Sequence, residues 1–142
     1  MQYVFSEDKT NHVSKFGIDL TLYGSITPDM DVSRVKVEKG HFEEFKCTSW
    51  FVYYILEGSG IYVLDDEKLP VKKGDIVSIP PNTRIHYFGN MEMLLIVSPL
   101  WKQENETHIR DVDPSEDPLV SKDQNIWHIL AVMLIYCKLR SF

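Results

Sequence analysis

Two stretches decide the fold of this chain: YILEGSG at residues 54–60 and GDIVSIPPNT at residues 74–83. Gly58, Gly60 and Gly74 stand where tight turns between strands need a positive φ or a close approach of two backbones. Pro80 and Pro81 have no backbone N–H to give to a sheet, so they end the strand before them. The two stretches therefore predict short β-strands separated by firm turns.

Further strand patterns lie on both sides of these stretches. Residues 17–23 and 34–38 alternate apolar and polar side chains, which is typical of half-buried strands. Residues 51–56 form a continuous apolar run, which favours a strand buried on both faces. We expect this run to form a hairpin with 61–64, and 85–88 to form another with 93–97. Many short strands at regular spacing predict an all-β sandwich or barrel.

The two ends of the chain differ from this central region. Residues 1–16 are polar and predict an N-terminal arm or a short strand, and residues 102–120 predict a polar linker. Residues 121–142 predict a hydrophobic helix, with a capping box formed by Ser121 and Gln124. Its apolar run of a dozen residues extends about 18 Å, too short to span a membrane. An apolar helix of this kind needs cover, so we expect a homodimer.

Length and charge exclude several classes of protein. A chain of 142 residues fits one domain. The net charge of −6 and the absence of a basic face argue against a nucleic-acid partner. The first residues contain no apolar signal core, so we expect a cytoplasmic protein. Cys47 and Cys137 show no zinc-type spacing and are expected to be reduced thiols.

The stretches at 54–60 and 74–83 resemble the end of the first motif and the start of the second motif of small single-domain cupins. The resemblance covers about residues 15–100. It implies an all-β fold, a double-stranded β-helix (jelly-roll) barrel over residues 17–101, followed by the C-terminal helix. Cupins commonly pair through their sheets, which agrees with a homodimer.

The resemblance also implies where a metal would bind, because many cupins hold one with histidines and a glutamate. Counting from the motifs places the two first-motif histidines at Phe45 and Cys47, or one residue earlier at Glu44 and Lys46. The glutamate position falls on Phe51 and the second-motif histidine on Ile85, with His86 one residue late. A transition metal needs about three or four protein ligands, so we expect no metal and no other cofactor. The alternative is a displaced divalent metal site, formed if a loop at 40–49 folds inward and brings together His41, Glu43, Glu44, Cys47 and His86. Otherwise His41 and both glutamates belong to a solvated loop.

The candidate ligand-binding residues are those expected inside the barrel or at its mouth: Phe45, Cys47, Phe51, Tyr53, Tyr62, Arg84, Ile85 and His86. Arg84 suits an anionic ligand, or else it forms a surface salt bridge. We expect a small-molecule-binding cupin, with no catalytic residue assigned. The alternatives are a metal-dependent sugar isomerase, epimerase or dioxygenase, and a structural module whose barrel is filled by its own side chains.

Overall fold

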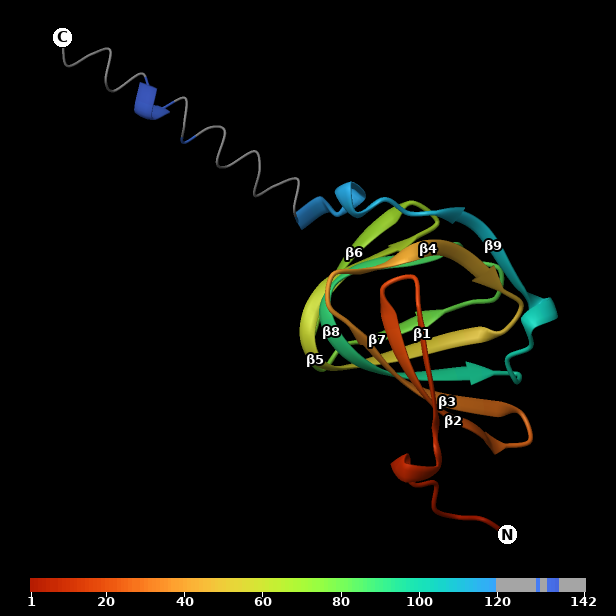
Figure 1. The fold of residues 1–142 in the computed structure, drawn as a ribbon. Helices are drawn as coiled ribbons and strands as arrows, with labels where there is room; N and C mark the ends of the chain where they lie inside the picture. Colours follow the sequence, from red (N-terminus) through yellow and green to blue (C-terminus); the bar gives the residue numbers. More distant parts are fainter. Residues whose placement is uncertain (120–129, 131–132, 136–142) are drawn as a thin grey trace. The chain divides into compact units, whose positions relative to one another are not determined.

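The computed structural model describes residues 1–119, 130 and 133–135 of the chain. The described part contains a sheet of nine antiparallel strands (Figure 1). The strands are β1 (Asn11–Lys15), β2 (Ile18–Thr27), β3 (Met30–Val37), β4 (Gly40–Cys47), β5 (Trp50–Leu64), β6 (Glu67–Lys72), β7 (Ile76–Ile79), β8 (Ile85–Ser98) and β9 (Glu106–Asp111). Three short 3-10 helices are η1 (Glu7–Lys9), η2 (Gln103–Asn105) and η3 (Pro114–Glu116).

Two long strands, β5 and β8, join two halves of the barrel. They pair with each other from Trp50↔Ser98 to Leu64↔Ile85. The first half of β5 and the second half of β8 form one sheet with β7, β3, β2 and β1. The remaining halves form another sheet with β6, β4 and β9. The sheet curls round on itself (Figure 1), so the expected all-β barrel is confirmed.

The two expected hairpins are wrong, because residues 57–60 and 89–90 lie inside continuous strands. Their glycines bend the strands instead of reversing them. Gly60 pairs with Gly89, and a Cβ on Gly60 would lie 2.2 Å from the Phe88 carbonyl oxygen. Gly58 has a φ of +85° beside a register shift between Ile55 and Glu57. Glycine thus allows two backbones to approach and to change sheets together. Gly74 does lie in a turn, as expected.

The solvated loop expected around residues 40–49 is also wrong, because residues 40–47 form β4 and His41, Glu43 and Glu44 are buried. The polar linker expected over residues 102–120 contains β9, which pairs with β4. These two differences have one cause. Charged side chains on β4 find partners on β9 and β8, which lets a charged segment form an internal strand. The expected N-terminal arm likewise contributes β1, paired with β2.

The core lies on the inner face of the barrel. Phe51, Tyr53 and Ile55 of β5 are buried, whereas Trp50 and Tyr54 are 47% and 41% exposed. Residues 51–56 therefore alternate, and the expected burial on both faces is wrong. A second, smaller cluster comprises Ile61, Val63, Phe88 and Val112, with Phe42 packed against it. Since Tyr62 and Tyr87 belong to the inner core, their strand neighbours in this cluster face outward.

The chain divides into two units, Met1–Val112 and Asp113–Phe142, and all nine described strands belong to the first. Of the helix predicted over residues 121–142, residues 130 and 133–135 are helical, and the others lie outside the described residues. Within the described residues, no helix is long and apolar enough to cross a membrane. The homodimer inferred from this helix stays a prediction.

Candidate functional site

A cavity of about 330 Å³ lies between the inner faces of the barrel. Its walls are mostly apolar, with a few polar groups, which is the usual make-up of a small-molecule site. His41 on β4 and Tyr87 on β8 line the cavity and are buried, and both side chains can exchange a proton or form hydrogen bonds. The lining residues are Val13, Lys15, Ile18, Leu20, Leu22, Gly24, Asp31, Ser33, Val35, His41, Phe45, Phe51, Tyr87, Leu95, Val97, Trp101 and Glu106.

His41 is a buried histidine whose two ring nitrogens both lack a hydrogen-bond partner. Its ring packs against Phe45 and Tyr87, with centroids 5.2 and 5.1 Å apart. Burial lowers the pKa of His41 to about 3, and the charges of Lys15 and His86 act in the same direction. The imidazole is therefore neutral near pH 7 and can accept a proton or a hydrogen bond from a molecule in the cavity.

A cluster of three tyrosines adjoins His41. The ring of Tyr62 lies 4.8 Å from that of Tyr87 and 5.2 Å from that of Tyr53. The Tyr53 and Tyr87 side chains form a hydrogen bond, whereas the Tyr62 hydroxyl is buried without a partner. Burial raises the pKa of all three hydroxyls. They are therefore neutral groups that can donate hydrogen bonds.

The unpartnered Tyr62 hydroxyl leads to a stability prediction. We expect Tyr62→Phe to raise the free energy of unfolding by about 1 kcal/mol, because it removes a buried polar group that has no hydrogen bond. Tyr53→Phe is the matched control, and we expect it to destabilise the protein because Tyr87 then loses its partner. Urea unfolding of both variants measures the difference. A loss of stability in Tyr62→Phe would show that its hydroxyl is bonded in solution.

Charged groups gather at the more exposed edge of the cavity. Lys15 Nζ lies 3.9 Å from Glu106 Oε2 and 6.0 Å from the centre of the Trp101 ring. The Trp101 backbone N–H donates a hydrogen bond of 2.6 Å to Asp31. Burial raises the pKa of Glu106, although Lys15 and Trp101 act against this shift. This edge can hydrogen-bond the polar end of a ligand whose other end lies among apolar walls.

The structure places the sequence-predicted site residues in three groups. Phe45 and Phe51 line the cavity, and Tyr53 and Tyr62 belong to the aromatic cluster around it. Cys47, a free thiol, and Ile85 are buried in the inner core and do not line the cavity. Arg84 and His86 lie in a separate polar network.

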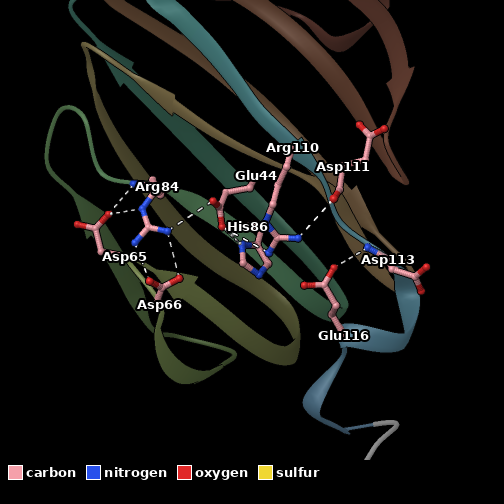
Figure 2. A network of polar contacts seen from close by, with 9 residues as sticks. All are labelled: Glu44, Asp65, Asp66, Arg84, His86, Arg110, Asp111, Asp113 and Glu116. Atoms are coloured by element: carbon pink, nitrogen blue, oxygen red, sulfur yellow. Dashed lines mark hydrogen bonds and ion pairs between the residues drawn. The ribbon is translucent and has the colours of Figure 1, made fainter.

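That network surrounds Glu44 (Figure 2). Arg84 hydrogen-bonds Asp66 at 3.1 and 2.8 Å and lies 3.6 Å from Glu44. Glu44 Oε2 lies 3.2 Å from His86 Nδ1 and 3.7 Å from Arg110. The hydrogen bond from Arg84 lowers the pKa of the Asp66 carboxyl. Arg84 is thus engaged by carboxylates, in line with the salt-bridge interpretation.

The residues present do not fit a metal of the cupin kind. Within the described part of the chain, no group of three or more histidine, cysteine, aspartate or glutamate side chains is placed to hold an ion. The five residues considered for a displaced site separate into two pairs and one single residue: Glu43 lies beside His41, Glu44 lies beside His86, and Cys47 is a free, buried thiol.

From the sequence, His41 was considered only for a displaced metal site, and Tyr87 was not assigned to the site. A signal for Tyr87 was present, because Ile85 was assigned to the inner face and residues two apart in a strand share a face. His41 was hidden by the charged residues that follow it. Its alternation with Phe42, and its place two residues before Glu43, are visible only once residues 40–47 are recognised as a strand.

Known proteins that are similar to this chain support the assignment of a cupin barrel. The cupin domain model matches residues 34–98. A structure of Pac13, described as a unique nucleoside dehydratase, is 43% identical in sequence, and a variant of Streptomyces Pac13 with uridine is 42% identical. The match covers 83% of this chain and 99% of that one, with a TM-score of 0.79. The chain belongs to the cupin family.

Two curated relatives match over shorter segments. An uncharacterised Methanocaldococcus jannaschii protein is 49% identical over 51 residues, which cover 34% of this chain and 41% of that protein. Acireductone dioxygenase of Leptospira biflexa is 35% identical over 92 residues, which cover 62% of this chain and 49% of that enzyme. The chain thus spans about half or less of the length of each curated relative.

Proposed function

We propose that this protein binds a nucleoside in the barrel cavity and eliminates water from it, with His41 as the base. The observation that carries the proposal is the His41 imidazole itself. It is buried, neutral and without a hydrogen-bond partner, on the wall of a cavity of about 330 Å³. A polar group left unpartnered in such a place costs free energy, which a ligand offsets when it binds.

The similarity to Pac13 supports the choice of ligand and reaction. Three of its uridine complexes are of variants in which one histidine is changed to glutamine or one of two tyrosines to phenylalanine. Those two tyrosines are as far apart along their chain as Tyr53 and Tyr87 are here. His41 lies before Tyr53 at nearly the separation of the histidine from the first tyrosine.

The chemistry follows from the protonation states of these groups. A neutral imidazole removes a proton bound to carbon, a C=C bond forms, and the hydroxyl on the neighbouring carbon departs as water. Such a weak base requires a C–H bond that a neighbouring carbonyl has acidified, so we expect the reacting nucleoside to carry an oxidised sugar. Tyr87 lines the cavity, and its neutral hydroxyl donates a hydrogen bond to an oxygen of the substrate. Tyr53 orients Tyr87 through the hydrogen bond between their side chains.

Uridine is the probe that tests binding. We expect calorimetric titration to give a dissociation constant between about 1 µM and 1 mM, the range of 4–8 kcal/mol that modest small-molecule sites reach. Tyr87→Phe should weaken binding by about three- to tenfold, the contribution of one neutral hydrogen bond. A mass decrease of one water on incubation with an oxidised nucleoside would report the reaction.

Tyr54→Phe is the matched control, because it makes the same change on the outer face of β5, away from the cavity. It should leave uridine affinity unchanged. Absence of uridine binding at millimolar concentration would overturn the proposal. Equal affinity in wild type, Tyr87→Phe and His41→Gln would show that uridine binds outside this cavity.

A further inference from the structure

A buried carboxylate joins His41 to a second histidine. Glu43 lies on β4 two residues after His41, and its side chain is 8% exposed. One carboxylate oxygen, Oε1, lies 3.7 Å from His41 Nε2. The other, Oε2, lies 2.7 Å from Nδ1 of His108 on β9, and His108 Nε2 lies 3.4 Å from Asp111. The contact with His108 therefore fixes the Glu43 side chain, and its other oxygen, Oε1, faces His41.

Phe16 covers this group from the turn between β1 and β2. Its ring stacks on His108 at 5.9 Å and 22°, and it meets His41 edge to face at 6.4 Å. Phe16 and Gly17, with φ of +48° and +89°, form the two-residue link between the paired Lys15 and Ile18. Such turns favour Asn, Asp or Gly, so a phenylalanine there is strained. Its contacts with the two histidines offset that strain.

We infer that Glu43 is the positioning residue of His41: it accepts a hydrogen bond from Nε2–H and leaves Nδ1 as the nitrogen that takes up the substrate proton. The inference rests on the proposed function for the reaction, although not for the tautomer. His108 fixes the orientation of Glu43, and Phe16 packs against both histidines. Hydrogen bonds of this kind are often long before the substrate binds, as the 3.7 Å separation is here.

This arrangement answers a difficulty in the reaction. Burial disfavours a positive charge on His41, so an isolated imidazole in this cavity would be a poor base. When the substrate proton passes to Nδ1, the carboxylate beside Nε2 balances the new charge, as the buried aspartate does in catalytic triads. The imidazolium then gives the proton to the departing hydroxyl, which leaves as water. Glu43 exchanges no proton, and His41 returns to its neutral form.

The tautomer of His41 tests the inference without substrate. Long-range proton–nitrogen NMR spectra of protein labelled with ¹⁵N-histidine distinguish Nε2–H from Nδ1–H, and His41→Gln identifies the signals of His41. We expect Nε2–H in the wild type. Glu43→Leu, which removes the acceptor at similar volume, should shift His41 toward Nδ1–H or a mixture. Glu43→Gln should retain Nε2–H, because an amide oxygen still accepts.

Glu44→Gln is the matched control, since Glu44 is the next residue, equally buried, but pairs with Arg84 and His86. It should leave the His41 tautomer unchanged. Nδ1–H in the wild type, or a tautomer insensitive to Glu43→Leu, would overturn the inference. The expected tautomers together with a failure to bind uridine would contradict the proposed function alone.

Turnover supplies a second readout. Glu43→Gln should lower kcat by about 10- to 100-fold with little change in KM, because the lost charge matters only once His41 is protonated. Phe16→Asn suits the turn, so it should keep or raise stability and still lower kcat. An unchanged kcat in Glu43→Gln, or a loss confined to KM, would show that Glu43 has only a packing role.

Discussion

Acidification from pH 7.5 to 4.5 should lower the free energy of unfolding of the wild-type protein by about 3 kcal/mol more than that of a His41→Gln variant. The pKa of His41 is about 3 in the folded protein and 6.5 in the unfolded chain. Between these values the unfolded chain binds a proton that the folded protein does not. The stabilising contribution is therefore complete above pH 6.5 and falls as the pH decreases toward 3, by about 5 kcal/mol in all.

Urea unfolding of both proteins across this range measures the effect. Carboxylates that titrate in the same range are shared by wild type and variant, so their contribution cancels in the difference. His12→Gln, an exposed histidine on β1, is the control and should follow the wild type. Parallel pH profiles for wild type and His41→Gln would mean that the folded protein protonates His41, which would remove the basis for a neutral base in the cavity.

Gly58→Ala should destabilise the protein by about 3 kcal/mol or more. Two effects add at this position. Its φ of +85° is strained for alanine, and the new Cβ would lie 2.0 Å from the Asn90 carbonyl oxygen on the paired strand β8. The backbone of β8 cannot move away without opening the pairing that joins the two sheets. Thermal or urea unfolding should show the loss.

Gly74→Ala separates the two effects. Gly74 has a similar φ of +92°, but a Cβ there meets nothing within 4 Å. Its substitution should therefore cost only the strain, about 1 kcal/mol. If the two variants were equally destabilised, the close approach of β5 and β8 at Gly58 would contribute nothing, and the bend of the barrel would depend on φ alone.

The fold class could be predicted because alternation and turn residues are local signals. The connectivity could not, because glycine serves two purposes that look alike in a sequence. At Gly74 it reverses the chain, whereas at Gly58 and Gly89 it bends a continuous strand. What distinguishes them is whether a partner strand runs alongside, and that is a property of the pairing between β5 and β8 rather than of either segment.

Some residues of the candidate site could be predicted from the sequence, and others could not. Phe45 and Phe51, placed from the cupin resemblance, line the cavity, whereas Tyr53 and Tyr62 lie in the aromatic cluster beside it. His41 and Glu43 could not be predicted, because a run of charged residues ordinarily predicts solvent exposure. Their partners come from β9, itself hidden in a polar segment that predicted a linker. The two segments, β4 and β9, pair with each other, and each supplies partners for the charged side chains of the other.

Much of the cavity wall lies outside the segment that matches the cupin domain model. Residues 34–98 match the cupin model, yet Val13, Lys15, Ile18, Leu20 and Leu22 line the cavity from the β1–β2 hairpin, and Trp101 and Glu106 line it from beyond β8. His41 and Tyr87 lie inside the matched segment, whereas the hairpin and the residues after β8 form much of the wall around them. Substitutions in one hairpin and one terminal segment can therefore change which molecule fits the cavity. Proteins grouped by their shared barrel segment can therefore differ in what they bind.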